Sequence, residues 1–362
     1  MKKRIAILLS LILLLGTAAW AVAAGSADDP LVSLSYLTGK FSKAMNQEIQ
    51  DALDKSDKKL INALEEGEGL DTAALQWTEV RLKQEDVLSG QTGTMVLPLA
   101  GAMRVNYESG AVVDVTTGQV IPNGGTLAVD HRYLVAEDTE AEFVVVDRTA
   151  VLDYQGDAFF AESDAVDYNA MAAALKEMNL FKGSFTGYGE GFDLELAPTR
   201  LQALIMFIRV LGEEDEALAW TGSQPFKDIH EGTQAFQYVG YAYEKGYTNG
   251  YTATEFRPAG AVNVFQYTEF ILRAMGYSSA QNTNIGDALA RAQVAGVLTE
   301  GETVALQAVK FLRADLVYLS YYALDAALPD GSMTLGDLLE EKGVFTGKEW
   351  KTAHNLVTSD RM

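Results

Sequence analysis

The chain has 362 residues, 28 of them basic and 50 acidic, which gives a formal net charge of −22. This charge argues against nucleic acid as a partner, because binding to phosphates depends on Lys and Arg. The absence of Cys excludes disulfides and thiolate metal sites. With 48% hydrophobic and 22% charged residues, the composition is that of a folded protein with room for two or three domains.

Residues 1–24 have the pattern of a signal peptide. A basic start at 2–4 precedes an apolar run over 5–15, and Ala21-Val22-Ala23 is a small-residue cleavage pattern. The alternative is an uncleaved anchor, for which an apolar span of about 20 residues is needed. Cleavage removes three basic residues and takes the net charge from −22 to −25. We therefore expect an exported protein without a membrane segment in its mature form.

Residues 25–70 are predicted to hold one long amphipathic helix, over 31–66. Apolar side chains recur at steps of three, four and seven between Leu34 and Leu64, and polar residues fill the other face. An isolated helix of this kind needs a packing partner. The partner is either the rest of the chain or a second copy, so a homo-oligomer through this helix is one open alternative.

Residues 71–160 are rich in Val, Thr, Tyr and Gly, which favours short strands separated by turns. The expected strands are 77–83, 94–97, 103–107, 112–115, 133–136 and 142–147. This pattern predicts a small all-β sandwich or barrel.

The stretch 226–277 predicts two helices joined by an ordered loop. Gly246 and Gly276 fit left-handed helix caps, and Gly250 closes an Asn-Gly turn. Pro258 keeps the preceding Arg257 extended. Asp228 is interpreted as a helix N-cap. So small a unit has little core of its own and typically stacks against copies of itself.

The stretch 226–277 resembles the S-layer homology (SLH) repeat in the order of its features. These features are F-x-D, an aromatic-rich helix, G-x-x-x-G, F-x-P, a second helix and a closing Gly. Weaker copies are predicted at 168–212, without the opening F-x-D, and at 284–325. The resemblance implies an all-α SLH pseudo-trimer over 165–330, followed by a C-terminal extension, 331–362. Within the extension, one short helix is predicted near 335–341. With the long helix and the β segment, the chain resembles exported SLH proteins of Gram-positive bacteria, and its expected fold class is multidomain α+β.

The resemblance also implies a site where each second helix begins. There the family carries a T-R-A-E-like motif, whose Arg contacts an anionic secondary cell-wall polysaccharide that is often pyruvylated. The motif is matched by Thr199-Arg200 and, in its later part, by Arg313-Ala314-Asp315, whereas the second repeat has Asn263-Val264 and no Arg. An Arg fork suits a carboxylate, and a helix N-terminus adds partial positive charge and free N–H groups.

Three glycines, Gly183, Gly246 and Gly250, match glycine positions of the family's loops, where backbone geometry explains them better than ligand contact. For Arg200 and Arg313, the alternative is an ordinary surface pairing with nearby acids. A further set of side chains could stack on sugar rings, although two or more are expected in the core. This set is Tyr241, Tyr243, Tyr247 and Tyr251.

Enzyme signatures are missing from the sequence. The three His lie in separate segments without metal-ligand spacing, and there is no G-x-S-x-G elbow or phosphate loop. We therefore predict no catalytic residue, no metal and no cofactor. The expected function is non-enzymatic anchoring of a surface protein to the cell wall. Two alternatives stay open: a scaffold or oligomerisation protein with degenerate, non-binding repeats, and a wall-polysaccharide hydrolase in the β domain, since a glycosidase needs only two carboxylates.

Overall fold

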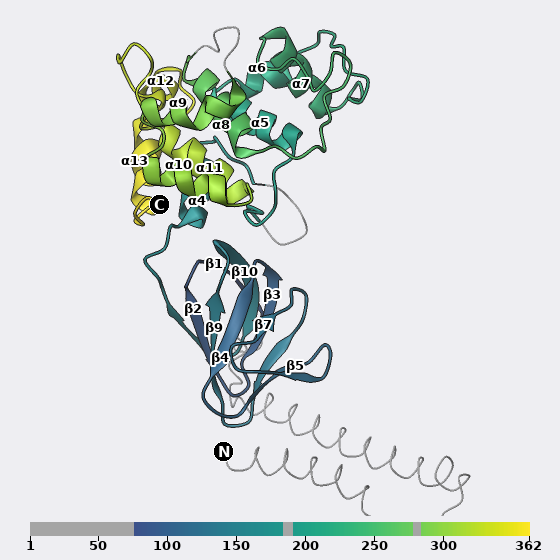
Figure 1. The fold of residues 1–362 in the computed structure, drawn as a ribbon, viewed down its shortest axis with the longest axis vertical. Coiled ribbons are helices and arrows are strands. Elements are labelled where there is room, and N and C mark those ends of the chain that lie inside the picture. The colour runs from purple at the N-terminus through teal and green to yellow at the C-terminus, as the bar shows by residue number, and fades with distance from the viewer. Residues whose placement is uncertain (1–75, 184–190, 278–283) are drawn as a thin grey trace, which may run out of the picture. The chain divides into compact units, whose positions relative to one another are not determined.

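The computed structural model describes residues 76–183, 191–277 and 284–362. The expected signal peptide, the N-terminal helix and any oligomer formed through it lie outside these residues. Within them the chain forms strands from 78 to 161 and helices from 168 onward (Figure 1). The expected combination of a β domain followed by a helical region is confirmed.

The β domain consists of two antiparallel sheets. One has six strands, in the spatial order β1-β10-β3-β8-β5-β6, and the other has five, in the order β11-β2-β9-β4-β7. The strands of the first sheet are β1 (Thr78–Lys83), β10 (Thr149–Gln155), β3 (Met95–Ala100), β8 (Tyr133–Ala136), β5 (Ala111–Asp114) and β6 (Gln119–Ile121). Those of the second are β11 (Ala158–Ala161), β2 (Val87–Gln91), β9 (Glu140–Val145), β4 (Met103–Tyr107) and β7 (Thr126–Leu127). Two separately hydrogen-bonded sheets make this a sandwich rather than a barrel.

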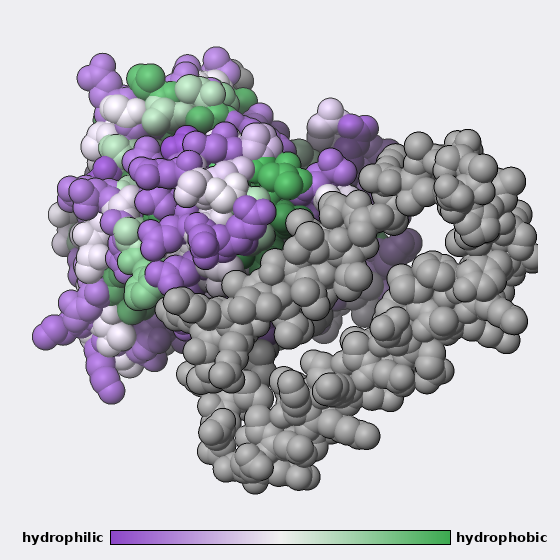
Figure 2. All heavy atoms as spheres, turned by 90° about the horizontal axis from the view of Figure 1, so that it is seen from below, coloured by the Kyte–Doolittle hydropathy of each residue, from purple (hydrophilic) through white to green (hydrophobic). Residues whose placement is uncertain are grey.

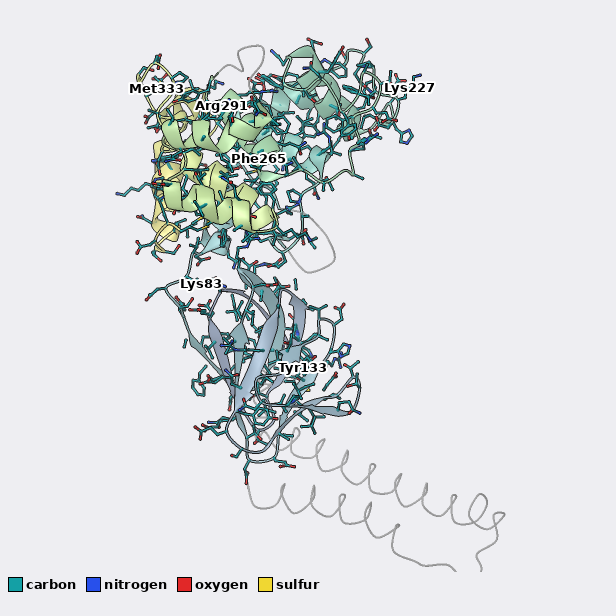
Figure 3. The ribbon with its side chains drawn as sticks, viewed as in Figure 1. Lys83, Tyr133, Lys227, Phe265, Arg291 and Met333 are labelled. Carbon is teal, nitrogen blue, oxygen red and sulfur yellow. The ribbon has the colours of Figure 1, made fainter. Side chains whose placement is uncertain are left out.

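The core of the sandwich follows from alternation along the strands. Leu88, Phe143 and Val105, from neighbouring strands of the five-stranded sheet, are fully buried, while the residues beside them in sequence are more exposed. Tyr133 lies inside the domain (Figure 3), where its hydroxyl oxygen accepts the Ala128 N–H at 2.7 Å. The sandwich therefore keeps one outward face on each sheet, free to carry polar side chains.

The helical region has ten α-helices in its described residues. They are α4 (Tyr168–Glu177), α5 (Arg200–Val210), α6 (Glu214–Leu218), α7 (Gln234–Glu244), α8 (Val264–Ala274), α9 (Ala288–Val294), α10 (Glu300–Ala308), α11 (Arg313–Ala323), α12 (Leu335–Glu341) and α13 (Gly347–Leu356). A 3-10 turn, η4 (Ile285–Asp287), leads into α9. The helices share one hydrophobic core, which includes the fully buried rings of Phe207, Tyr267 and Tyr318.

The packing order of the helices is cyclic. The first helix of the second repeat, α7, packs on α5, the second helix of the first repeat. In the same way α9 of the third repeat packs on α8 of the second, and α4 of the first packs on α11 of the third. Each repeat thus places its first helix on the second helix of the repeat before it, and the ring closes between the third and the first (Figure 1).

The C-terminal segment 331–362 belongs to the same core. Leu335, Leu339 and Phe345 are buried in it, and α13 packs along α4. Arg361 donates from Nε to Glu302 at 2.6 Å, and the Glu302 carboxylate is fully buried. The predicted helix at 335–341 is confirmed, whereas α10 and α13 were not expected.

The face of the molecule drawn in Figure 2 is predominantly hydrophilic. Figure 2 shows a face on which polar side chains surround scattered hydrophobic ones. Among the described helices, none combines the length and the apolar character needed to cross a membrane.

Candidate functional site

The second helices of the first and third repeats begin against the loop of the next repeat in the ring. At the start of α5, the Arg200 N–H donates to Gly260 O at 2.8 Å and the Leu201 N–H to Pro258 O at 3.1 Å. We call this contact the α5 junction. At the start of α11, the α11 junction, the Arg313 N–H donates to Leu196 O at 2.8 Å and the Ala314 N–H to Leu194 O at 3.1 Å.

The two motif arginines make equivalent side-chain contacts at these junctions. Arg200 Nε donates to Phe256 O at 2.9 Å, and Arg313 Nε donates to Phe192 O at 3.1 Å. Phe256 precedes Pro258 by two residues and Gly260 by four, and the carbonyls of these two residues cap α5. Phe192 stands in the same relation to Leu194 and Leu196, whose carbonyls cap α11. Each arginine therefore ties its helix to the neighbouring loop through Nε, and this leaves the terminal nitrogens of the fork for other partners.

The expectation of free N–H groups at these helix starts is wrong. The first two N–H groups of α5 and of α11 are used by the neighbouring loop, and Thr199 Oγ1 accepts the third in α5, from Gln202, at 3.2 Å. Gln202 in turn accepts the Thr199 N–H at 2.9 Å, which completes a capping box. What the helix starts retain for a ligand is the partial charge of the helix dipole together with the arginine fork.

The α8 junction lacks the arginine contact. Asn263 caps α8 and Val264 occupies the position of Arg200 and Arg313. In the described ranges, no loop carbonyl accepts from the N–H groups of Val264 or Phe265. The contact between α8 and α11 depends instead on buried side chains, including a 2.7 Å hydrogen bond between Tyr267 Oη and Ser320 Oγ.

A pocket of about 160 Å³ opens beside the α11 junction. It is lined by Arg313, Arg209, Gln202 and Gly183, together with apolar side chains of α5 and α11. Arg313 is only 5% exposed, and its burial lowers the pKa of the guanidinium. Arginine nevertheless stays charged in proteins. The pocket thus offers a fixed positive group in apolar surroundings, the environment in which an anion is held strongly.

The second lining arginine, Arg209, is already paired. Its Nε donates to Glu214 at 2.8 Å, and the same carboxylate accepts Lys182 Nζ at 2.6 Å. In contrast, no described carboxylate lies within ion-pair distance of Arg200 or Arg313. Described acids nevertheless act on both arginines at longer range, Asp193 and Glu195 on Arg313 and Asp228 on Arg200, so the alternative of an ordinary pairing with nearby acids stays open.

The α5 junction is more open and carries a second arginine. Arg200 lies with its Cζ 5.1 Å from the centre of the Phe256 ring, and Arg257 Cζ lies 3.7 Å above the Tyr251 ring. Tyr251 is 57% exposed. Arg257 is not among the site residues that the sequence predicts, although its place between Phe256 and Pro258, next to the motif loop, could have indicated it.

Two expectations for this loop are wrong. Arg257 is not extended but has a φ of +61°. Asp228 is not a helix N-cap, since Thr233 caps α7. The Asp228 carboxylate accepts the N–H groups of Phe256 at 2.9 Å and Arg257 at 2.6 Å, which holds the left-handed turn. Partial burial acts to raise the pKa of Asp228, but these two donors outweigh it and lower the pKa below its usual range.

The three glycines do not gather at one place. Gly183 lines the pocket at the α11 junction with a φ of +69°. Gly246 and Gly250, with φ of +73° and +78°, follow α7, and a Cβ on Gly250 would lie 2.2 Å from the Phe226 ring. Their positive φ angles confirm the predicted backbone role.

The tyrosines divide as expected. Tyr241 is in the core, and Tyr247 packs half-buried against it. Both hydroxyls donate to Glu213 at 2.9 Å. Tyr243 and Tyr251 are exposed. Within the described residues, no group of three or more His, Asp or Glu side chains is arranged to hold a metal ion.

Comparison with known proteins identifies one domain. A family model for the S-layer homology domain matches residues 225–263. A cell surface protein of Thermoanaerobacter kivui is 29% identical over 184 residues, which make up 49% of this chain and 23% of the relative. The matched part therefore spans less than a quarter of that protein.

Solved structures add little to this. Procruciferin, an 11S globulin of Brassica napus, is 8% identical over 29% of this chain and 28% of its own, with a TM-score of 0.17. The pumpkin pro-11S globulin is 12% identical over 29% of each chain, also with a TM-score of 0.17. Scores this low carry no argument about fold or function.

Proposed function

Because the chain carries an S-layer homology domain at residues 225–263, we propose that it is held non-covalently at the cell surface by binding an anionic secondary cell-wall polysaccharide. The cyclic packing of the three predicted repeats supports an SLH pseudo-trimer in which the first and third repeats retain their motif arginine. The protein is non-enzymatic in this proposal, and the sandwich serves structure or interaction.

The observation that carries the proposal is the state of the two motif arginines. Each is oriented by one Nε bond to a loop carbonyl, and the described carboxylates that act on them, Asp193 and Glu195 on Arg313 and Asp228 on Arg200, do so without a direct ion pair. A pre-oriented guanidinium can place its two terminal nitrogens on a carboxylate, such as the pyruvyl group of a modified sugar, without further ordering. The acidic net charge of the protein does not prevent this, because exposed charges are screened beyond about 8 Å at physiological salt.

Thr199 and the three glycines are assigned supporting roles. Thr199 fixes the start of α5 and so the direction of Arg200, and Gly183 lets the chain pass close to Gly191 beside the pocket. Gly246 and Gly250 shape the loop after α7. The absence of Arg at Val264 favours the competing scaffold function at the α8 junction, so we expect binding at two junctions rather than three.

The test is co-sedimentation of the purified chain with cell-wall sacculi. We compare Arg200→Ala, Arg313→Ala and the double variant with Arg104→Ala, which removes an exposed positive charge from strand β4 of the sandwich. Loss of a hydrogen-bonded charge contact of about 1.5–3 kcal/mol weakens binding about 10- to 150-fold per arginine. Arg104→Ala should bind like the parent.

Two controls separate folding from binding. Thermal unfolding of each variant shows whether loss of the Nε bond has disrupted the junction, and sacculi stripped of the secondary polymer show whether that polymer is the ligand. Equal sedimentation of the parent and the double variant would contradict anchoring through these arginines. If even the parent fails to sediment, the scaffold function is favoured, and release of reducing sugar would favour a hydrolase.

A further inference from the structure

The outward face of the five-stranded sheet carries a cleft of about 670 Å³, within the range of about 300–1,000 Å³ that is usual for ligand sites. The strand register explains its floor. Phe159 of β11 pairs with Ser89 of β2, Ser89 pairs with Glu142 of β9, and Glu142 pairs with Asn106 of β4. These four residues form one row across four strands.

A second row lies two residues along on the same face. Gln91 pairs with Glu140, and the turn after β4 places Glu108 at the rim of the cleft. Between the rows, Gly90 and Ala141 are buried, as the alternation of strands requires. The polar side chains of both rows therefore point away from the core and into the cleft.

These polar side chains are unused by the fold. Within residues 76–183, the side chains of Gln91, Asn106, Glu140 and Glu142 make no hydrogen bond or ion pair to another part of the protein. Phe159, at the end of the first row, is 65% exposed, which is unusual for so large an apolar ring. A row of free donors and acceptors beside an exposed aromatic ring is an arrangement that a ligand can complete.

The lining decides the chemistry of that ligand. Glu108, Asp138, Glu140 and Glu142 line the cleft, and no Lys, Arg or His does. An anionic polymer is therefore repelled. Donors are present as well, from the side-chain amides of Gln91 and Asn106 and the hydroxyl of Ser89. The Lys and Arg side chains of a cationic peptide offer donors alone, whereas every hydroxyl of a polyhydroxyl ligand both donates and accepts, which suits a lining that holds donors beside its carboxylates.

We propose that this cleft binds a neutral glycan chain, whose hydroxyls pair with the carboxylates and amides and whose apolar sugar face packs on Phe159. The site is separate from the arginine junctions and takes the opposite chemistry. A chain with both sites could hold an acidic wall polymer through its helices and a neutral one through its sandwich. This inference does not depend on the anchoring function, because it uses other residues and another ligand.

The test is isothermal titration of the full chain with soluble oligosaccharides, so that attachment to walls plays no part. The probes are neutral oligomers of chitin, β-glucan, mannan and galactan type, an acidic galacturonate oligomer and a lysine oligomer. Phe159→Ala and Asn106→Ala should each weaken binding of the neutral probe about tenfold. Phe160→Ala is the matched control, since it removes the next ring on the same strand, which packs against Tyr154 instead.

Each outcome decides the proposal. Binding of a neutral oligomer that is lost in Phe159→Ala but kept in Phe160→Ala supports it. Binding of the lysine oligomer alone, with strong salt dependence, overturns it in favour of a basic peptide, and failure of every neutral probe also overturns it. Release of reducing ends that Glu142→Gln abolishes would replace a binding site with a catalytic one.

Discussion

Replacement of Arg148 by Met tests how the sandwich and the helical core are joined. Arg148 follows β9 and forms an ion pair with Asp315 of α11, and its Nη2 donates to Lys310 O at 2.8 Å. The Asp315 side chain is fully buried, and it also accepts the Leu312 N–H at 2.7 Å. Met keeps much of the volume of Arg148 but leaves a buried carboxylate without its cation.

The magnitude follows from the burial of Asp315. Burial raises its pKa from 3.8 to about 6, even though Arg148 and the Leu312 N–H act to lower it. A difference of about two units corresponds to about 3 kcal/mol of cost for the ionised form at neutral pH. Removal of one partner of such a pair typically costs about 3–5 kcal/mol, or about 6–20 °C in Tm for a region of this size.

The sign of the pH dependence is fixed by the direction of the shift. A carboxyl with a raised folded-state pKa contributes stability that is present below pH 3.8 and is lost as the pH rises through about 6. Arg148→Met raises this pKa further, so the variant should lose more stability at pH 8 than at pH 5. In an Asp315→Asn background, which keeps an acceptor for Leu312 N–H, the same substitution should cost less and depend little on pH.

The assay is circular dichroism at 222 nm during thermal unfolding, at pH 5 and pH 8, for the four proteins of this double-mutant cycle. Equal losses at the two pH values, or a loss below about 2 °C at both, would refute the assignment of a buried ionic link between the sandwich and α11.

Three further changes test the helical core by thermal unfolding. Gly250→Ala should lower the free energy of unfolding clearly more than Gly246→Ala, for which a loss of about 1–2 kcal/mol is expected. Both glycines have a positive φ, but only Gly250 has an aromatic ring where the new Cβ would lie. Equal losses in the two variants would contradict this. Asp228→Ala should lower the free energy of unfolding by about 1–3 kcal/mol at pH 7. The loss should shrink as the pH falls below the ordinary carboxyl pKa near 4, because a carboxylate with a lowered pKa stabilises the fold only while it is ionised. A loss that stays constant down to pH 2 would argue against the two N–H bonds. Arg361→Ala should cost about 3–5 kcal/mol by leaving Glu302 buried and unpaired, and an unchanged Tm would show that the C-terminus does not hold this carboxylate.

The predictions that succeeded rest on signals local in sequence. Gly246 and Gly276 end α7 and α8 with positive φ, as their positions after two amphipathic stretches indicated. The helix at 335–341 likewise has its cap, Thr334, directly before it. Where a few adjacent residues decide the backbone, the sequence is sufficient to predict it.

The failures occur where a distant residue overrides a local preference. The expected strands leave out residues 84–93, yet Gly90 lies inside β2, where the side chain of Thr94 fills the space above it. Arg257 precedes Pro258, which favours an extended backbone, yet Asp228, 29 residues away, holds it at φ +61°. The junction bonds of Arg200 and Arg313 could not be foreseen for the same reason, since their carbonyl partners belong to other repeats.

The equivalent geometry of the two arginine junctions explains how the second repeat can lack an arginine and still pack. At α5 and α11 one side chain has two tasks, because Nε fixes the neighbouring loop while the terminal nitrogens remain for a ligand. At α8 the structural task has passed to buried aromatic packing, with Tyr267 lying 6.1 Å from Phe311. An arginine at 264 is therefore not needed for folding, and its absence removes only the proposed ligand contact without opening the ring. By this reasoning, the free energy of unfolding of Val264→Arg should stay within about 1 kcal/mol of the parent only if the new side chain reaches solvent. A gain of wall affinity in this variant would show that the α8 junction can still bind the wall polymer.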